Sequence, residues 1–403
     1  MEYIKIGDIA KSIVSGGTPK STKSEYYNGN IPWLNTKEIN FNRIYSTEKC
    51  ITDAGLKNSS AKYIKENCVI IAMYGATAGR AAINKIPLTT NQACCNIEVD
   101  ASKMDYNYVY YAIKNDWEHL ASLANGGAQQ NLNSLIIKEF KIPYVDLNTQ
   151  KKVSKILSSI DKKVELNNEI NNDLFELLKS SFKSKFYNKK EKDSHFADFI
   201  SGTIGGDWGK DNPEGNNNTK VYCVRGADIP NMEYGNKGNA PIRYILEKNY
   251  KSKKLDPNNI IIEISGGSPT QSTGRTAYIT QSILDMYDSP LLCTNFCRAI
   301  ETKNEILAPF VYMNLKLMYE DNIFFNWENG TTGIKNLALN DMLSNIEVKK
   351  PDEDDLKEYD LLFNSVMNKI SHNSNENIKL EQLRDTLLPK LINGEIELEN
   401  IEI

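Results

Sequence analysis

The alternation of apolar and polar residues predicts two globular regions of mixed helix and strand. Short apolar runs bounded by Gly, Asn and Ser are typical of buried strands, and apolar residues at helical spacing are typical of amphipathic helices. Strand-like runs occupy residues 68–73, 96–99 and 141–145 and recur at 221–225, 259–264 and 297–300, and helical spacing occurs at 106–120 and 308–321. Each region is therefore predicted to be α+β with a mostly β core.

Two other segments carry the seam of a coiled coil. Apolar or Asn residues recur at steps of four and three from Val153 to Leu178, and a shift of 206 residues finds the same seam from Tyr359 onward. Only the last position departs, where Leu383 supplies the apolar group beside Arg384. The expected pairing residues are Val153, Leu157, Ile160, Val164, Asn167, Asn171 and Leu174 in the first helix and Phe363, Val366, Ile370, Asn373, Asn377 and Leu380 in the second.

The two Asn residues of each seam occupy the same two mid-seam positions. One interpretation is that they lie on the surface, as many Asn residues do. Their coincidence in both helices favours the other interpretation, in which the helices pair and buried Asn side chains fix the register.

These helices belong to an internal repeat that spans the chain. Matching features keep the same order in both halves: Gly pairs at 16–17 and 205–206, Gly-Arg at 79–80 and 274–275, Thr-Asn at 90–91 and 294–295, and Asn-Leu at 131–132 and 336–337. The chain is therefore predicted to hold two copies of one domain-plus-helix unit. The predicted segments are domains at 1–145 and 191–350, a helix at 146–190, and a helix with an acidic tail at 351–403.

The formal net charge of −4 conceals a strong asymmetry between the two helical segments. Residues 146–192 carry 11 basic and 7 acidic side chains, whereas residues 351–403 carry 5 and 13. A solvated acidic tail would explain the second segment alone. Antiparallel packing of the two helices about a pseudo-twofold axis explains both, because opposite charges then face each other.

Composition places the chain among ordinary globular proteins. Of its 403 residues 40% are hydrophobic and 25% are charged, and no apolar run is long enough to span a membrane. The seven scattered cysteines do not resemble the disulfide framework of a secreted protein, so a reducing cytoplasm is expected.

Motifs for catalysis are mostly missing from the sequence. The three His residues have no Cys or His neighbours at metal spacing, and P-loop, dinucleotide-binding and nucleophile-elbow motifs do not occur. The acidic string at 351–357 is similar to a metal-nuclease site, with Asp355 as its candidate ligand. Its carboxylates, however, cluster at a predicted helix start, where they favour the helix N-terminus. A nuclease and a non-DNA interaction scaffold are the two alternatives to a DNA-binding protein.

Loops at matched positions carry side chains suited to nucleic acid. Arg can contact guanine and Asn or Gln adenine, while Lys and Ser serve phosphates. The candidates in the first half are Lys20, Lys23, Trp33, Asn35, Lys37, Tyr74, Thr77, Arg80, Gln92, Gln129 and Gln130. Those in the second half are Lys210, Arg225, Ser268, Gln271, Arg275, Asn329, Thr331 and Lys335.

Taken in order, these segments resemble the specificity (S) subunit of type I restriction–modification systems, over essentially the whole chain. The resemblance rests on residues 6–19, 31–34, 69–80, 128–132, 140–143 and 150–186, and above all on Leu-Glu-Gln-Leu-Arg-Asp-Thr-Leu-Leu-Pro-Lys-Leu-Ile-Asn-Gly at 380–394. The second half departs from the family pattern in a longer loop at 205–218 and in Lys349-Lys350-Pro351, where Ile-Pro is usual.

The resemblance implies a DNA-binding subunit from a bacterium or archaeon, without catalysis or a cofactor of its own. Two target-recognition domains would each read half of a split double-stranded DNA target, and the antiparallel helices would set the gap. The implied partners are two methyltransferase (M) subunits, which bind S-adenosylmethionine, and restriction (R) subunits, which bind ATP and Mg²⁺. No membrane is implied, and the isolated chain is expected to bind DNA weakly.

Overall fold

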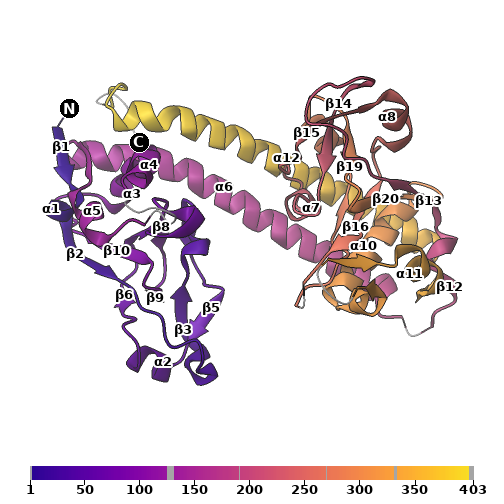
Figure 1. Cartoon of the computed structure of the whole chain (residues 1–403), viewed down its shortest axis with the longest axis horizontal. Coiled ribbons are helices and arrows are strands. Elements are labelled where there is room, and N and C mark those ends of the chain that lie inside the picture. The colour runs from indigo at the N-terminus through magenta and orange to yellow at the C-terminus, as the bar shows by residue number, and fades with distance from the viewer. Residues whose placement is uncertain (1, 125–130, 190, 269, 331–333, 399–403) are drawn as a thin grey trace. The chain divides into compact units, whose positions relative to one another are not determined.

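The computed structural model describes residues 2–124, 131–189, 191–268, 270–330 and 334–398 (Figure 1). Contacts divide the chain into two compact units. Unit 1 comprises Met1–Lys163 and Leu380–Ile403, and unit 2 comprises Val164–Lys379. The long helices α6 (Leu147–Phe182) and α12 (Glu353–Ile392) each contribute one part to either unit. Each unit is therefore a globular region built on segments of both helices.

Unit 1 contains two main sheets and a strand pair. The five-stranded sheet has the order β2 (Ala10–Ser15), β10 (Cys94–Val99), β7 (Val69–Ala72), β8 (Ala81–Asn84), β4 (Asn42–Ile44). The four-stranded sheet has the order β5 (Lys49–Ile51), β3 (Tyr27–Leu34), β9 (Leu88–Thr90), β6 (Tyr63–Ile64), and β1 (Glu2–Lys5) pairs with β11 (Lys141–Tyr144). The short helices are α1 (Ile6–Ile9), α2 (Asp53–Lys57), α3 (Tyr106–Asn115), α4 (Trp117–Ser122) and α5 (Ser134–Glu139).

Unit 2 repeats much of this plan. One sheet has the order β13 (Ile200–Gly205), β20 (Cys297–Thr302), β16 (Ile260–Glu263), β18 (Thr276–Tyr278), and another β15 (Ile242–Leu246), β14 (Asn217–Val224), β19 (Leu291–Cys293). Smaller sheets join β17 (Ser265–Gly266), β22 (Lys335–Leu337) and β21 (Glu328–Asn329), and β12 (Ser194–His195) with β23 (Glu347–Val348). Its helices are α7 (Ile229–Glu233), α8 (Glu247–Lys253), α9 (Gln281–Asp285), α10 (Leu307–Glu320) and α11 (Leu339–Asn345).

The predicted duplication is confirmed by strand order. The order β2, β10, β7, β8 in unit 1 matches β13, β20, β16, β18 in unit 2. The parallel pair β3–β9 likewise matches β14–β19. The predicted α+β class with a mostly β core is confirmed in both units.

Backbone hydrogen bonds correct two of the predicted correspondences by one residue. The amide of Asn91 donates to the carbonyl of Leu34 (3.0 Å), and the amide of Thr294 donates to that of Val224 (2.9 Å). Asn91 therefore corresponds to Thr294, and not to Asn295. The sequence comparison had aligned the two Thr-Asn dipeptides because their residue types match. The backbone hydrogen bonds show that the correct alignment of the two repeats differs by one residue.

The two Gly pairs shift in the same way. The amide of Gly17 donates to Thr90 (2.8 Å) and that of Asp207 to Cys293 (2.9 Å), so Gly16 corresponds to Gly206. A Cβ on Gly16 would lie 2.2 Å from the carbonyl oxygen of Thr90, and one on Gly206 would lie 1.9 Å from that of Thr294. Glycine is needed there because the backbones pass too close for any side chain.

Two predicted helices also differ at their ends. The helix expected at 106–120 is split at Asp116 into α3 and α4, where the backbone leaves helical geometry. The helix expected over 146–190 begins at Leu147 and is α-helical to Phe182, and the following residues, Lys183–Tyr187, form a π-helical turn.

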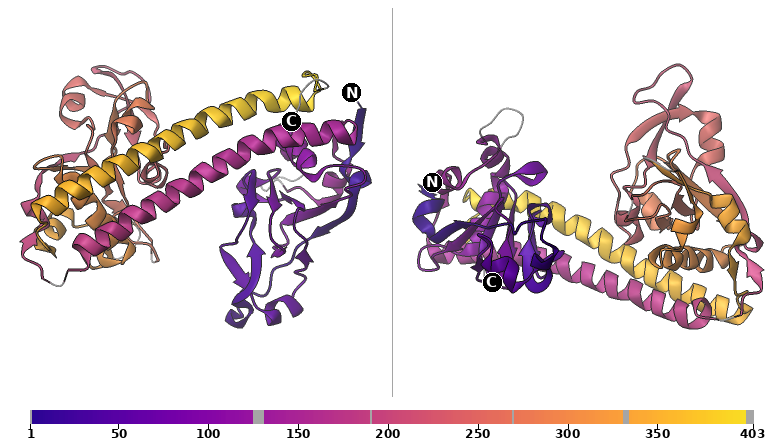
Figure 2. Two further views of the ribbon diagram at one scale, coloured as in Figure 1. Left: turned by 180° about the vertical axis from the view of Figure 1, so that it is seen from behind. Right: turned by 60° about the horizontal axis from the view of Figure 1, so that its bottom comes forward.

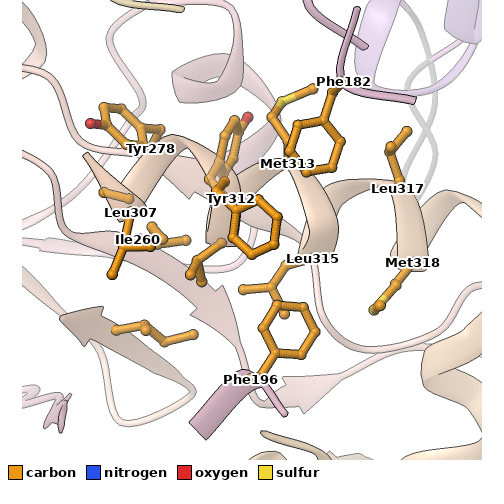
Figure 3. Packing of buried hydrophobic residues seen from close by; sticks show 14 of the residues in the cluster. Phe182, Phe196, Ile260, Tyr278, Leu307, Tyr312, Met313, Leu315, Leu317 and Met318 are labelled. Atoms are coloured by element: carbon orange, nitrogen blue, oxygen red, sulfur yellow. The ribbon is translucent and has the colours of Figure 1, made fainter. Parts of the chain in front are cut away.

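Each unit has a hydrophobic core that includes the ends of both long helices. In unit 1, Leu157 of α6 and Leu388 of α12 are buried in the core cluster. The 206-residue shift relates these two residues to Phe363 and Phe182, which are buried in the core of unit 2. Figure 3 shows Phe182 beside Met313, with Tyr278 and Tyr312 nearby. Equivalent helix positions are thus buried in both cores, and they hold Leu in unit 1 and Phe in unit 2.

The helices run antiparallel within each unit. In unit 2 the Nδ2 atoms of Asn167 and Asn373 donate to Asn377 and Asn171, respectively, each at 2.8 Å. Figure 2 shows α6 and α12 side by side in this unit. The other expected pairing residues are buried in their own units, except Leu174 and Leu380, which are partly buried. The expectation for Leu383 was wrong, because Leu383 is about half exposed, whereas Arg384 is largely buried and pairs with Asp161.

Candidate nucleic-acid interface

Four loops of unit 1 meet beyond the ends of β3, β7 and β9. The Gly17 loop is bonded to Thr90, as described above, and the hydroxyl of Thr18 donates to the side chain of Gln92. The two remaining loops follow β3 and β7. They are joined by the hydroxyl of Thr77, which donates to the carbonyl of Thr36 (2.9 Å). The structure therefore brings together loops that the sequence places up to 74 residues apart.

Unit 2 joins the equivalent loops by equivalent bonds. Besides the bonds of Thr294 and Asp207, the amide of Ile264 donates to the carbonyl of Phe296 (2.8 Å), matching the bond from Met73 to Ala93 in unit 1 (2.8 Å). These loops enclose a pocket of about 450 Å³. One loop framework is thus present twice, with different side chains.

Most candidate residues of unit 1 lie on or near these loops. Lys20, Lys23, Lys37, Tyr74 and Gln92 are exposed, and Asn35, Thr77 and Arg80 are half-buried. Lys37 forms an ion pair with Glu48. Arg80 donates to the side chain of Asn40 (2.6 Å) and lies over the ring of Trp117. The exposed members can contact DNA without any change in the core.

Trp33 is a correction to the predicted set. Its side chain is only 5% exposed and belongs to a small hydrophobic cluster. Its Nε1 donates to the carbonyl of Gly17 (2.9 Å), and Tyr27 contacts its ring edge-on. Trp33 therefore positions the Gly-pair loop and offers no ring face to DNA. Asn35 also has a local role, because its side chain caps the helical turn Thr36–Glu38.

The two Arg candidates of unit 2 are both held by carboxylates. Arg225 forms hydrogen bonds from Nε and Nη2 to Asp228 (3.0 and 3.2 Å), and Arg275 from Nε and Nη2 to Glu263 (2.9 and 2.6 Å). These hydrogen bonds raise the pKa of both guanidinium groups. Arg225 remains about half exposed and can contact a ligand, whereas Arg275 mainly positions Glu263.

The remaining candidates of unit 2 are spread over other loops. Lys210 pairs with Glu214 (3.4 Å), and Lys335 pairs with Glu328 (2.7 Å). Gln271 donates to the hydroxyl of Tyr319 (2.9 Å). Asn329 is also exposed, and Ser268 is half-buried. The predicted residues Gln129, Gln130 and Thr331 lie outside the described residues.

The sequence candidates did not include the pocket's aromatic and acidic lining. Trp208, Phe296, Glu263 and Thr294 all line it. The signal for Trp208 was present, because residues 206–208 correspond to Gly16-Gly17-Thr18 at an offset of 190. Nothing in the sequence marked Glu263 as a site residue, because it lies at the end of an apolar strand run and its counterpart in unit 1 is Ala72.

The acidic cluster at 351–357 lies at the start of α12. Asp355 accepts a hydrogen bond from Lys185 (3.0 Å), and Lys357 pairs with Glu353 one turn away (2.7 Å). Within the described ranges, no group of three His, Cys, Asp or Glu side chains could hold a metal ion. No helix in the described part of the chain is long and apolar enough to cross a membrane.

Comparison with known proteins shows which family the chain resembles. The profile described as "Type I restriction modification DNA specificity domain" matches residues 1–176. The type I restriction enzyme MjaIX specificity subunit of Methanocaldococcus jannaschii is 26% identical over 98% of this chain and 94% of its own length. Over nearly its whole length the chain is thus similar to type I restriction enzyme specificity (S) subunits.

Two further relatives bear on particular regions and on the fold. The EcoR124I/EcoR124II specificity subunit of Escherichia coli is 29% identical over 40% of this chain and 41% of its own. A crystal structure of the S subunit from M. genitalium matches 97% of this chain and 95% of its own chain, with a TM-score of 0.55 and 17% identity. This likeness supports the fold of two repeated units with long helices.

Proposed function

We propose that this chain is the S subunit that gives a type I restriction–modification complex its DNA sequence specificity, with each unit reading one half of a split target. The observation that carries the proposal is the loop framework, which is built twice with the same backbone hydrogen bonds. Loops on a rigid scaffold are the usual place for recognition residues. Because the two sets of side chains differ, the two half-targets should differ as well.

The chain is proposed to act without catalysis or a bound cofactor of its own. Two methyltransferase subunits would bring S-adenosylmethionine and methylate adenines, and restriction subunits would use ATP and Mg²⁺. The continuous helices α6 and α12 would set the unread gap between the half-targets. The net charge of −4 is compatible with DNA binding by the whole complex, because the partner subunits can supply the cationic surface that binds the phosphates.

Two exposed leucines provide a proposed docking position for the methyltransferase subunits. Leu177 in unit 2 and Leu383 in unit 1 are about half exposed and are related by the 206-residue shift. A repeated chain that binds two identical partners needs one equivalent patch in each unit, and these residues meet that requirement.

Co-expression with the cognate methyltransferase, followed by sequencing for methylated adenines, tests the proposed function. The expected result is a split, asymmetric motif, and exchange of residues 1–145 should change one half of it. A contiguous motif, or none, would contradict the proposal. A scaffold unrelated to DNA would show no dependence of the methylated sequence on the exchanged domain.

A further inference from the structure

The pocket of unit 2 has aromatic walls that no described neighbour covers. The side chains of Trp208 and Phe296 line it and are 39% and 56% exposed. The guanidinium of Arg243 lies 4.2 Å from the ring centroid of Trp208, and its Nε donates to the Trp208 carbonyl (2.8 Å). The indole is thus held in place although its ring remains accessible. Exposed aromatic rings on a nucleic-acid-binding surface are typical platforms for stacked bases.

A carboxylate lies in the same pocket. Glu263 is only 4% exposed, and both of its oxygens accept hydrogen bonds from Arg275. Each carboxylate oxygen can accept a further hydrogen bond. A Cβ on Gly226, which also lines the pocket, would lie 2.2 Å from Oε1 of Glu263. Any larger residue at this position would therefore collide with the carboxylate.

Thr294 adds a second polar group to the lining. Its side chain is 98% buried, and its hydroxyl has no oxygen or nitrogen partner among the described residues, although the thiol of Cys297 lies beside it. A buried hydroxyl without such a partner costs free energy unless a ligand supplies one. Arg225 lies at the pocket with about two-fifths of its side chain exposed and can donate to a ligand.

Unit 1 lacks these features at the corresponding positions. Thr18 stands in place of Trp208, Ala72 in place of Glu263 and Ala93 in place of Phe296. The hydrogen bond between Thr18 and Gln92 joins the two loops that carry the aromatic residues in unit 2. The aromatic walls and the carboxylate are therefore additions to the shared framework in unit 2, and unit 1 serves as an internal control.

We infer that this pocket takes one nucleobase carrying an exocyclic amino group out of the stack of the half-target read by unit 2, an inference that rests on the proposed function. The two rings stack on the base, and Glu263 accepts the amino N–H. The edge of a stacked base does not enter a pocket, and the carboxylate is almost fully buried. The base must therefore leave the helix to reach it, as flipped bases do in other DNA-binding proteins.

The test uses the full chain in complex with its methyltransferase subunits, on duplexes that contain the motif found by sequencing. A mismatch opposite a base that leaves the stack lowers the cost of unpairing and tightens binding. Scanning the half-target of unit 2 should find one such position. The methylated adenine is left out of the scan, because its own extrusion by the methyltransferase would give the same signal.

Variants then assign the signal to the pocket. Trp208→Ala and Phe296→Ala should each weaken binding to the motif by about tenfold to a hundredfold, the loss of one stacked base. Trp208→Phe should retain most of the binding affinity that Trp208→Ala loses. Ile242→Ala, at an exposed apolar residue of unit 2 that does not line the pocket, is the matched control and should bind normally. Glu263→Gln should relax the base preference at the same single position.

Distinct outcomes separate this inference from the proposed function. No split motif in the wild-type complex would overturn both. A split motif together with normal binding by the Trp208→Ala and Phe296→Ala variants would overturn the pocket alone, and so would an equal loss of binding on unrelated DNA. Adenosine, cytidine or guanosine monophosphate binding as tightly as the motif duplex would show a free-nucleotide site and would also overturn it.

Discussion

Asp161 of α6 accepts a hydrogen bond from Arg384 of α12 at 2.9 Å, and both side chains are largely buried in unit 1. Arg43 of the recognition domain lies 3.4 Å from the other carboxylate oxygen, and the hydroxyl of Tyr111 donates to it at 2.6 Å. One carboxylate thus joins both helices to the globular region. The 206-residue shift relates Asp161 and Arg384 to Met367 and Leu178, which are buried in the core of unit 2.

Replacing Asp161 with Asn should strongly destabilise unit 1. The side chain of Asp161 is 7% exposed, and its removal leaves the cations of Arg43 and Arg384 without their shared anion. Breaking a buried ion pair from one side typically costs about 3–5 kcal/mol. Urea denaturation of the purified chain measures the change. Asp385→Asn is the matched control, because Asp385 also contacts Arg384 but is exposed, and its loss should cost less than about 1 kcal/mol. Equal losses in both variants would contradict the role given to Asp161.

The contribution of Asp161 should depend on pH in a defined direction. Burial opposes its ionisation, but Lys114, Tyr111 and Arg384 together hold the pKa of this carboxyl below its ordinary value. Its stabilisation is therefore full above the unfolded pKa of about 3.9 and is lost as pH falls through the lower folded value. The stability difference between wild type and Asp161→Asn should accordingly shrink below about pH 4. A difference that grows on acidification would contradict this assignment.

The paired amides of α6 and α12 should favour one register at some cost in stability. Asn171→Leu alone leaves the Asn373 amide without its partner and should cost about 1–3 kcal/mol. Asn171→Leu with Asn373→Leu replaces both partners and should recover most of that loss. Denaturation of the two single variants and the double variant gives the coupling energy. Strictly additive losses would show that the two side chains do not interact.

A charge at either exposed leucine should remove one methyltransferase subunit. Leu177→Glu and Leu383→Glu alter equivalent positions in different units, so each variant should bind one partner instead of two. Native mass spectrometry of the co-expressed complex counts the subunits. Asn368→Glu places the same charge at an exposed site of α12 and should leave two subunits bound. Normal stoichiometry in both Leu variants would reject the docking position.

Periodic features of the fold could be predicted from the sequence. The apolar and Asn residues at steps of four and three from Val153 to Leu178 predicted the long helix, because a helix that buries one face has buried residues at this spacing. The apolar run 69–72 gave β7, which is buried on both faces. Repeated side chains in a constant order gave the duplication. Each of these signals is local or is repeated within one chain.

Features that depend on tertiary contacts could not be predicted in this way. Trp33 was predicted as a recognition residue because its aromatic side chain was assigned to a loop, but it lies in β3 and its ring packs on Tyr27. The role of Glu263 depends on Arg275, twelve residues away across a loop. The exact alignment of Asn91 with Thr294 depends on one backbone hydrogen bond in each unit. Residue type alone carries no information about such distant partners.

Unit 1 is built from two segments that are far apart in the sequence, and this affects how the chain folds during synthesis. Leu388, Leu391 and Ile392, near the C-terminus, belong to the core cluster of unit 1. The N-terminal domain therefore emerges from the ribosome first but lacks part of its core until all of unit 2 has been made. At about 5–20 residues per second, the delay is on the order of ten to forty seconds. Nascent chains would expose apolar surface during that time, so chaperones that bind such surface should act on this half of the protein.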